Sequence, residues 1–586
     1  MALRNDIDNK FKWHLNDLFE TDEVWQKNYN ELKNQTQSIN SFQGKLSNLE
    51  TLKECLEKTY DVYEKFGRVY VYAHMKLHED TNNNFYQAMA DKADMLQTKI
   101  SAAASFIEPE ILNLDQQQLK LFVEQNNLYA HFIENLLRIK KHILSPEIEK
   151  ILADATQLAN APDNIYSMLS NADMDFGKIK MPNGKKIELT HGKFVSLMES
   201  FDRNLREKTF DTYYDAYINQ KNTIAAIYSA SVKNDVFFSR TRNFESTLAQ
   251  ALFSHNIPEN VYSNLTDTVN EYLPVLHDYM NVRKNALGIS NLHIYDMYVP
   301  IVPQVDTKIS FEDAKTIVKK ALAPLGNDYI EKLEEAFNSG WIDVYENKGK
   351  RSGAYSWGAY GCHPFVLLNF DKKVDDMFTL AHEMGHAMHS FYSWDTQPYL
   401  YADYTIFLAE IASTVNETLL MQYLLKTTDD KKFKAYLMNY FLEQFRRTLY
   451  RQTMFAEFEM QTHQLAEKDI PLTVDLLNET YRNLNLKYHG KDVILDSKSD
   501  MEWARIPHFY NAFYVYQYAT GYSSAIALSQ KILNGENNYR KFLQAGSSKY
   551  SIEILKEAGV DMTTPAPIRS ALEYFKNLVE EMKKII

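Results

Sequence analysis

Two histidines and a glutamate between residues 378 and 389 have the types and spacing to bind a metal ion. His382 and His386 are four positions apart, and Glu383 directly follows the first histidine. In an α-helix of 3.6 residues per turn, positions four apart lie on one face, so both imidazoles can reach one ion. Glu383 projects beside them, where its carboxylate can meet a water molecule on that ion. Because the flanking residues are apolar, the stretch predicts an amphipathic helix with a zinc site.

A zinc site that performs chemistry needs a third protein ligand, and one helix turn cannot supply it. Glu410 is the best candidate, because it is a lone acid in an apolar, helix-like run where an unpaired carboxylate would be unfavourable. Glu417 follows seven residues later on the same face, and we expect it to orient an imidazole. A solvated helix acid is the alternative for Glu417. His389 is expected to be a packed or hydrogen-bonded histidine rather than a ligand.

Two segments that precede the predicted zinc helix are expected to be strands. The run from Phe365 to Phe370 is typical of a buried strand, and residues 353–356 are its expected partner. A free strand edge beside a zinc helix can pair with an extended peptide and position the bond to be cut. We therefore expect Gly353, Ala354 and Tyr355 to contact substrate. An ordinary structural hairpin is the alternative.

A group of hydrogen-bond donors follows near the C-terminal end of the sequence. After His508 come Tyr514, Tyr518 and Tyr522, which are spaced four apart and would share one face of a helix. Phenol and imidazole groups can donate hydrogen bonds to a developing oxyanion. The alternative is a tyrosine-rich core helix, since the chain contains 39 tyrosines.

Composition limits the classes of function. The net charge is −13, and we find no basic face interleaved with aromatic residues, so nucleic acid is not an expected partner. Cys55 and Cys362 lie far apart and outside any Cys-x-x-Cys pair, which favours a reducing compartment. The N-terminus lacks the pattern of a signal peptide, and no segment approaches about 18 consecutive apolar residues. We expect a cytoplasmic protein without a membrane segment.

The length of 586 residues allows roughly two to four domains. From Trp25 to Glu149, apolar residues recur at spacings of three and four, as in helices. Near Asn183-Gly184 the period switches to two, and this dipeptide is a strong hairpin signal. We therefore expect an N-terminal helical domain over residues 1–195, with a β-hairpin near its end, and a catalytic domain over residues 196–586.

Taken together, these segments resemble the oligoendopeptidase F family, a bacterial branch of the thimet oligopeptidase-type zinc metallopeptidases. The likeness covers most of residues 200–586 and, more loosely, the helical N-terminal third. The segments that carry it, in the order of the family, are 341–356, 382–389, 410–417 and 505–522. The resemblance implies a mainly α fold, an elongated helical ellipsoid with a small β-sheet next to the zinc-binding helix. Its deep channel would admit short peptides and exclude folded proteins.

The resemblance also implies how a metal ion would be bound. It assigns one Zn²⁺ per chain to His382, His386 and Glu410, and it assigns the role of general base to Glu383.

For the C-terminal segment, the resemblance implies that His508 and a following tyrosine contact the substrate and the oxyanion. Tyr514 matches one of the two tyrosines of the family, and Tyr522 matches the second after a shift of one residue. The glycine-rich loop that precedes these tyrosines in eukaryotic members is missing here.

The implied function is that of a zinc-dependent endopeptidase that hydrolyses internal bonds of short oligopeptides in the cytoplasm. Two alternatives remain open. One is a zinc carboxypeptidase or dipeptidyl carboxypeptidase with a similar helix. The other is a helical protein that binds peptides without cleaving them.

Overall fold

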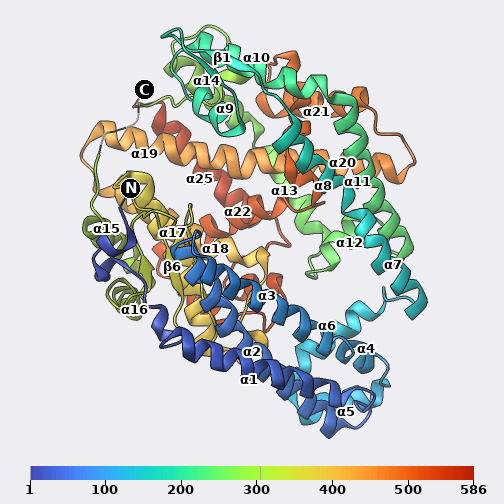
Figure 1. Cartoon of the computed structure of the whole chain (residues 1–586). Coiled ribbons are helices and arrows are strands. Elements are labelled where there is room, and N and C mark those ends of the chain that lie inside the picture. The colour runs from blue at the N-terminus through green and yellow to red at the C-terminus, as the bar shows by residue number, and fades with distance from the viewer. Residues whose placement is uncertain (1, 304, 306, 537, 586) are drawn as a thin grey trace. The chain divides into compact units, whose positions relative to one another are not determined.

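The structure is a computed structural model that describes residues 2–303, 305, 307–536 and 538–585 (Figure 1). The described residues form mostly helices, and the sheets among them have two or three short strands. This confirms the predicted mainly α fold class. None of the described helices combines the length and the apolar character that a membrane crossing requires.

The chain divides into two compact units, and each unit is assembled from three separate segments. The first unit comprises Met1–Lys141, Thr307–Tyr423 and Leu528–Gly559. The second unit comprises His142–Asp306, Leu424–Ala527 and Val560–Ile586. The domain boundary expected at residue 195 falls inside the first segment of the second unit. The compact units therefore divide the chain differently from its order in sequence.

The first unit begins with three packed helices whose ends are capped by side chains. Thr21, Asn48 and Asn83 each accept a hydrogen bond from a backbone N–H in the first turn of α1, α2 and α3, respectively. On α2, buried residues recur at the predicted helical spacing. The helices of this unit are α1 (Asp22–Ile39), α2 (Leu49–Glu79), α3 (Asn84–Ala104), α4 (Ile107–Leu112), α5 (Gln116–Gln125), α6 (Ala130–Lys140), α15 (Phe311–Leu322), α16 (Asn327–Asn338), α17 (Val374–Thr396), most of α18 (Ile406–Thr427), α23 (Tyr539–Gln544) and α24 (Ser551–Glu557).

A three-stranded sheet in the first unit lies next to α17. The strands are β4 (Ile342–Asp343), β5 (Tyr355–Trp357) and β6 (Phe365–Leu367), and β6 is central. It runs parallel to β4 and antiparallel to β5, and all its residues are buried. Both β5 and β6 contact α17. The predicted buried strand and its partner are present, although both are shorter than expected, and β5 is an edge strand of this sheet.

The second unit is also built mainly from helices. They are α7 (Pro146–Ala159), α8 (Ala161–Met168), α9 (His191–Met198), α10 (Arg203–Asn219), α11 (Lys221–Thr241), α12 (Thr247–Phe253), α13 (Glu259–Glu271), α14 (Leu273–Ala286), α19 (Lys431–Gln444), α20 (Arg451–Glu467), α21 (Val474–His489), most of α22 (Tyr516–Leu533) and α25 (Ala566–Met582). The strands β1 (Lys178–Lys180) and β2 (Lys186–Glu188) pair antiparallel around Gly184, whose φ of 81° suits glycine. A short parallel pair joins β3 (Leu292–His293) to β7 (Val493–Ile494).

Candidate active site

The helix α17 carries the His-Glu-x-x-His pattern, and its start is fixed by a carboxylate. The side chain of Asp376 accepts hydrogen bonds from the backbone N–H groups of Lys373 and Asp371, each at 2.8 Å. Such a carboxylate also interacts favourably with the positive end of the helix dipole. Most other residues of the helix are buried, whereas His382 and His386 remain partly accessible. The helix is therefore a firm support for two imidazoles that stay within reach of a ligand.

The helices α17 and α18 approach each other closely at Gly385. A Cβ atom on Gly385 would lie 2.5 Å from the Cα atom of Ser413 and 2.7 Å from the carbonyl oxygen of Ala412. Real Cβ contacts are longer, so only glycine fits at this crossing. Glu410 lies one turn before Ser413 on α18. The absence of a side chain at Gly385 thus lets α18 bring Glu410 next to the histidines of α17.

A buried amide holds the same two helices in register. Asn416 is fully buried, and its Nδ2 donates to the carbonyl oxygen of Ala381 at 3.0 Å. Its Oδ1 accepts a hydrogen bond from the hydroxyl of Tyr329 at 3.2 Å. Because unsatisfied buried amides are unfavourable, this pair of bonds specifies one alignment of α18 against α17.

The side chains of His382, His386 and Glu410 converge. Nε2 of His382 lies 3.2 Å from Nε2 of His386, and Oε2 of Glu410 lies 3.4 Å and 3.5 Å from these two nitrogens. A tetrahedral zinc ion with bonds of about 2.0–2.2 Å holds its ligand atoms roughly 3.3–3.6 Å apart. Two imidazoles and one carboxylate are also a donor set that zinc uses in catalytic sites. The residues present therefore fit a zinc ion with one open position.

The ionisation state of Glu410 agrees with a role as a metal ligand. The hydrogen bond to His386 is the main reason that the pKa of Glu410 is lowered to about 2, against the opposing effect of burial. The hydroxyl of Ser413 adds a hydrogen bond to Oε2 of Glu410 at 3.2 Å. Glu410 is thus held as a carboxylate, the form that binds a cation.

Glu417 and Glu383 both act electrostatically on His382. An oxygen of Glu417 forms a short hydrogen bond with Nδ1 of His382, which leaves Nε2 directed toward His386 and Glu410. Burial opposes the charged form of His382, but this bond and the nearby carboxylates outweigh it and raise its pKa to about 9. Burial raises the pKa of Glu383 above its ordinary value, and the two histidines counteract part of that rise. A carboxyl with a raised pKa is suited to receive and return a proton.

His389 does not join this group. Its ring is fully buried and stacks on Tyr404, with ring centroids 3.7 Å apart and an interplanar angle of 7°. Phe542 lies against the ring as well, with the centroids 4.9 Å apart. Burial lowers the pKa of His389 to about 3, so it is a neutral packing residue. This agrees with the expectation that His389 is packed rather than a ligand.

In the second unit, His508 lies near Tyr514, which was predicted, and near Tyr518. The ring centroids of Tyr514 and Tyr518 lie 6.4 Å and 5.9 Å from that of His508. Tyr522 is instead 6% exposed and packs edge-on against Phe445. The sequence pattern includes all three tyrosines, and only the family resemblance favours Tyr514 and Tyr522 for the oxyanion contact. The sequence feature that points to Tyr518 is its position four residues after Tyr514 and four residues before Tyr522.

Tyr514 does not share a helical face with Tyr518 and Tyr522, because α22 begins only at Tyr516. The chain turns just before this helix at Phe513, which has a φ of 55°, in the left-handed region. The backbone N–H of Phe513 donates to Oε1 of Glu459 at 3.0 Å, and Glu459 is fully buried on α20. Glu459 thus fixes the turn that presents Tyr514. This residue was missed because nothing in the sequence links an acid on α20 to that turn.

The predicted peptide-binding residues lie at and before the edge strand β5. Tyr355 begins β5, whereas Gly353, with a φ of 84°, and Ala354 precede it. The carbonyl oxygen of Gly353 accepts a hydrogen bond from Nδ2 of Asn369 at 2.7 Å. The hydroxyl of Tyr355 is hydrogen-bonded to Nδ1 of His78 at 2.7 Å. The turn and the tyrosine ring are therefore held in place by the first unit itself.

Replacing Gly385 by alanine is expected to weaken metal binding and to destabilise the protein. The added methyl group would overlap the backbone of α18, and overpacking of this kind typically costs about 1–3 kcal/mol. Relief of the overlap requires α18 to move away, which carries Glu410 away from the histidines. Zinc titration and denaturant unfolding of Gly385→Ala would measure both effects.

A matched control for this variant is Gly67→Ala. Gly67 lies inside α2 of the same unit, and a Cβ atom there would meet nothing within 4 Å. Alanine is favoured over glycine in a helix by roughly 1 kcal/mol, so this control should gain stability. If Gly385→Ala bound zinc as tightly as the unchanged protein, the close crossing would not be what positions Glu410.

Two imidazoles and a carboxylate from adjacent helices, with a further carboxyl beside them, are the arrangement of a metal-dependent peptidase. Comparison with known proteins specifies the family. A family model described as "Peptidase family M3" matches residues 196–574, and one described as "Oligopeptidase F" matches residues 110–176. The chain therefore belongs to peptidase family M3, which is zinc-dependent in general, and it is a metalloendopeptidase.

Individual proteins resemble this chain over nearly its whole length. It is 44% identical to oligopeptidase PepF of Bacillus subtilis, over 100% of this chain and 88% of the relative. It is 40% identical to group B oligopeptidase PepB of Streptococcus agalactiae, over 100% of this chain and 98% of the relative. Crystal structures of a putative peptidase from Chlamydophila abortus and of oligoendopeptidase-F from Enterococcus faecium match with TM-scores of 0.95 and 0.74 and identities of 34% and 36%. The first match covers 100% of this chain and 100% of the other chain. The second match covers 96% of this chain and 99% of the other chain.

Proposed function

We propose that this protein is a zinc-dependent endopeptidase that hydrolyses internal peptide bonds of short oligopeptides. One observation carries the proposal, namely the approach of Nε2 of His382, Nε2 of His386 and Oε2 of Glu410 to within 3.5 Å of one another. These three residues would hold one Zn²⁺ per chain. The names of the relatives in Bacillus subtilis and Streptococcus agalactiae support oligopeptides as the substrate class.

Glu383 is the proposed general base. When bound, zinc supplies Lewis acidity, which lowers the pKa of a coordinated water to about 7 and polarises a carbonyl group. Glu383 receives the proton of the attacking water and returns it to the amine that leaves, a role that typically contributes about 10²–10⁴-fold. Its burial beside the two histidines, with a raised pKa, supports this role.

Glu417 is proposed to orient one metal ligand. Its hydrogen bond to Nδ1 of His382 keeps a proton on that nitrogen, so that a metal ion displaces only the proton of Nε2 and binds the lone pair there. Carboxylates in this position typically contribute 10–100-fold to metal affinity or activity. Its hydrogen bond and its low exposure favour this role over that of a solvated helix acid.

His508 and Tyr514 are proposed to donate hydrogen bonds to the oxyanion that develops on the substrate carbonyl. The resemblance to the family assigns them this role, and one such donor is worth roughly 10²–10³ in turnover. Burial lowers the pKa of His508, so its imidazole is neutral at neutral pH and can still donate from one nitrogen. Tyr522 stays a weaker candidate because of its packing against Phe445.

The segment from Gly353 to Tyr355 is proposed to hold the substrate backbone. One edge of β5 pairs with β6, and no strand among the described residues pairs with its other edge. An extended peptide could add to that edge through backbone hydrogen bonds, which are independent of side-chain sequence. Such binding would suit an enzyme that accepts many short peptides.

The Tyr514→Phe variant is expected to lower turnover by roughly 10²–10³-fold with little change in peptide affinity. The reason is that the lost hydroxyl acts on the transition state rather than on the bound substrate. Steady-state kinetics of Tyr514→Phe, Tyr518→Phe and Tyr522→Phe would rank the three tyrosines. An unchanged rate in Tyr514→Phe would assign the oxyanion contact elsewhere.

Peptides with both termini blocked would test the proposed class of reaction. An endopeptidase should cleave an internally quenched peptide that carries an acetylated N-terminus and an amidated C-terminus, and mass spectrometry should show internal cuts. The activity should vanish when a chelator removes the metal and return when zinc is added. Cleavage only of peptides with a free C-terminus would indicate a carboxypeptidase, and binding without cleavage would indicate a peptide-binding protein.

A further inference from the structure

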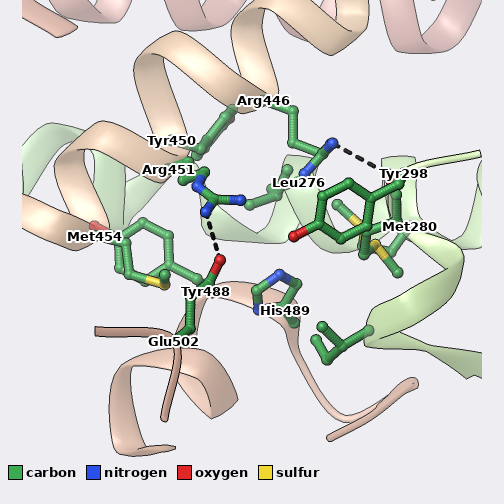
Figure 2. A pocket seen from close by; sticks show the side chains of 12 residues that line it. Leu276, Met280, Tyr298, Arg446, Tyr450, Arg451, Met454, Tyr488, His489 and Glu502 are labelled. Carbon is green, nitrogen blue, oxygen red and sulfur yellow. Dashed lines mark hydrogen bonds and ion pairs between the residues drawn. The ribbon is translucent and has the colours of Figure 1, made fainter. Parts of the chain in front are cut away.

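A small cavity inside the second unit is bordered by charged and hydroxyl-bearing side chains (Figure 2). Its volume is about 40 Å³. The wall is formed by α14, the π-helical turn Phe445–Tyr450, the start of α20, the end of α21, and the segments around Tyr298 and Glu502; leucine, isoleucine and methionine side chains form its apolar part. Room of about 10–15 Å³ is enough for one water molecule, so the cavity can hold a small ion but no amino-acid side chain.

Several donor groups at this cavity have no hydrogen-bond partner among the described residues. They are Nη1 of Arg446, Nε and Nη1 of Arg451, and the hydroxyl of Tyr298. The other two guanidinium nitrogens of Arg446 donate hydrogen bonds to Glu443 and to the carbonyl oxygen of Met297. Arg446 is 92% buried, since only 8% of its surface is exposed. Figure 2 shows the hydroxyl of Tyr298 directed toward the guanidinium of Arg451. An unpaired donor is most unfavourable where it is buried, as at Arg446, whereas Arg451 and Tyr298 are partly exposed; an acceptor in the cavity would pair with all three.

The charges around the cavity are unequal. Five arginines and two glutamates form two separate ion-pair clusters near the cavity, and arginines outnumber glutamates in each: Arg283, Arg446 and the half-exposed Arg447 pair with Glu443, and Arg451 and Arg505 pair with Glu502. The nearby Asp296 does not correct the excess, because it is paired with two further arginines. An uncompensated buried charge is strongly unfavourable. A bound anion would offset it.

Burial opposes the charged form of these arginines, but the neighbouring carboxylates and tyrosines outweigh it at Arg283, Arg451 and Arg505 and raise their pKa. Burial lowers the pKa of Arg447, to which the neighbouring charge of Arg446 also contributes. It lowers the pKa of His489, another wall residue, to about 4, so this imidazole adds no further positive charge. The positive charge at the cavity therefore comes from the guanidinium groups.

We propose that this cavity is a binding site for one small monovalent inorganic anion of the size of chloride, held by Arg446, Arg451 and Tyr298. Guanidinium and phenol groups supply N–H and O–H donors, which is what a halide ion requires. Glu502 borders the cavity too and accepts hydrogen bonds from Arg451 and Tyr481, so the anion and this carboxylate would share the guanidinium of Arg451. Because Glu502 lies on the 3₁₀ segment Ser497–Arg505, the anion would anchor that segment, which ends three residues before His508.

Diffraction from crystals of the full chain grown in bromide would test the site directly. Bromide scatters anomalously and has nearly the charge and size of chloride. We expect an anomalous peak inside the cavity, within hydrogen-bonding distance of the guanidinium groups of Arg446 and Arg451. A cavity filled only by water, without an anomalous peak, would overturn the proposal.

Thermal unfolding in solution provides a second, independent test. At constant ionic strength, replacing gluconate by chloride should raise the unfolding midpoint in a saturable way, because only the folded protein offers the site and gluconate is too large to enter it. Tyr298→Phe removes one donor and should raise the half-saturating chloride concentration about tenfold. A response to chloride no larger than that to gluconate would contradict the proposal.

Tyr450→Phe is the matched control for this variant. Tyr450 also borders the cavity, but its hydroxyl donates to the carbonyl oxygen of Tyr272 at 3.3 Å. Its loss should leave the half-saturating chloride concentration unchanged. Equal weakening by Tyr298→Phe and Tyr450→Phe would show that the chloride effect does not arise from a specific contact with Tyr298.

Discussion

Replacing Glu383 by glutamine is expected to abolish peptide hydrolysis while zinc still binds at one ion per chain. Glutamine preserves the size of the side chain but cannot accept a proton at neutral pH. The loss should be at least about 10²–10⁴-fold in turnover, the usual contribution of a general base. His382, His386 and Glu410 are unchanged in this variant, so the metal should remain. Steady-state kinetics and elemental analysis of the purified protein would measure the two quantities separately.

The control for this variant is Asp395→Asn. Asp395 lies on the same helix, three turns beyond Glu383, and it is exposed. The Asp395→Asn substitution also exchanges a carboxylate for an amide, yet it should leave turnover unchanged. Normal turnover in Glu383→Gln would exclude this residue as the base. Joint loss of zinc and activity would instead mean that Glu383 helps to hold the metal.

Two alanine variants are expected to separate metal binding from stability. Glu410→Ala removes a proposed ligand from a half-exposed position, so zinc affinity should fall by well over about 100-fold, more than the loss of an orienting group produces. His389→Ala empties a packed site between Tyr404 and Phe542, so the unfolding midpoint should fall while zinc remains bound. Zinc titration and thermal unfolding of both variants would show the two opposite patterns.

The opposite ranking would overturn the proposed ligand set. If His389→Ala lost zinc and Glu410→Ala kept it, the third ligand would have to come from α17. Unfolding is best compared in the metal-free forms, because bound zinc itself adds stability. In those forms, Glu410→Ala should differ little from the unchanged protein.

The part of the candidate site that is local in sequence could be predicted from the sequence. His382 and His386 share a face because of the period of the helix, which needs no knowledge of distant contacts. Glu410 was identified because a lone acid in an apolar run requires a partner. Both inferences use a single element at a time. The structure places the three side chains together, as those inferences require.

The features that depend on contacts between elements were not predictable. The need for glycine at residue 385 becomes visible only when the backbone of α18 is in place. Tyr514 was expected to share a helical face with Tyr522, but the turn at Phe513 delays the start of α22. That turn is fixed by Glu459, a residue more than 50 positions earlier. Hydrogen bonds over such distances leave no periodic trace in the sequence.

The first unit is assembled from three segments that are far apart in the sequence, and this has a consequence for the synthesis of the chain. The helix with the two histidines packs against α23, and the Phe542 ring of α23 lies against His389. The first unit therefore cannot bury this side of α17 until residues 528–559 have left the ribosome. At about 5–20 residues per second, the ribosome needs roughly 7–30 seconds to extend the chain from α17 to α23. During that interval the apolar surface of α17 is uncovered, so newly made chains are expected to depend on chaperones more than chains whose domains are continuous in sequence.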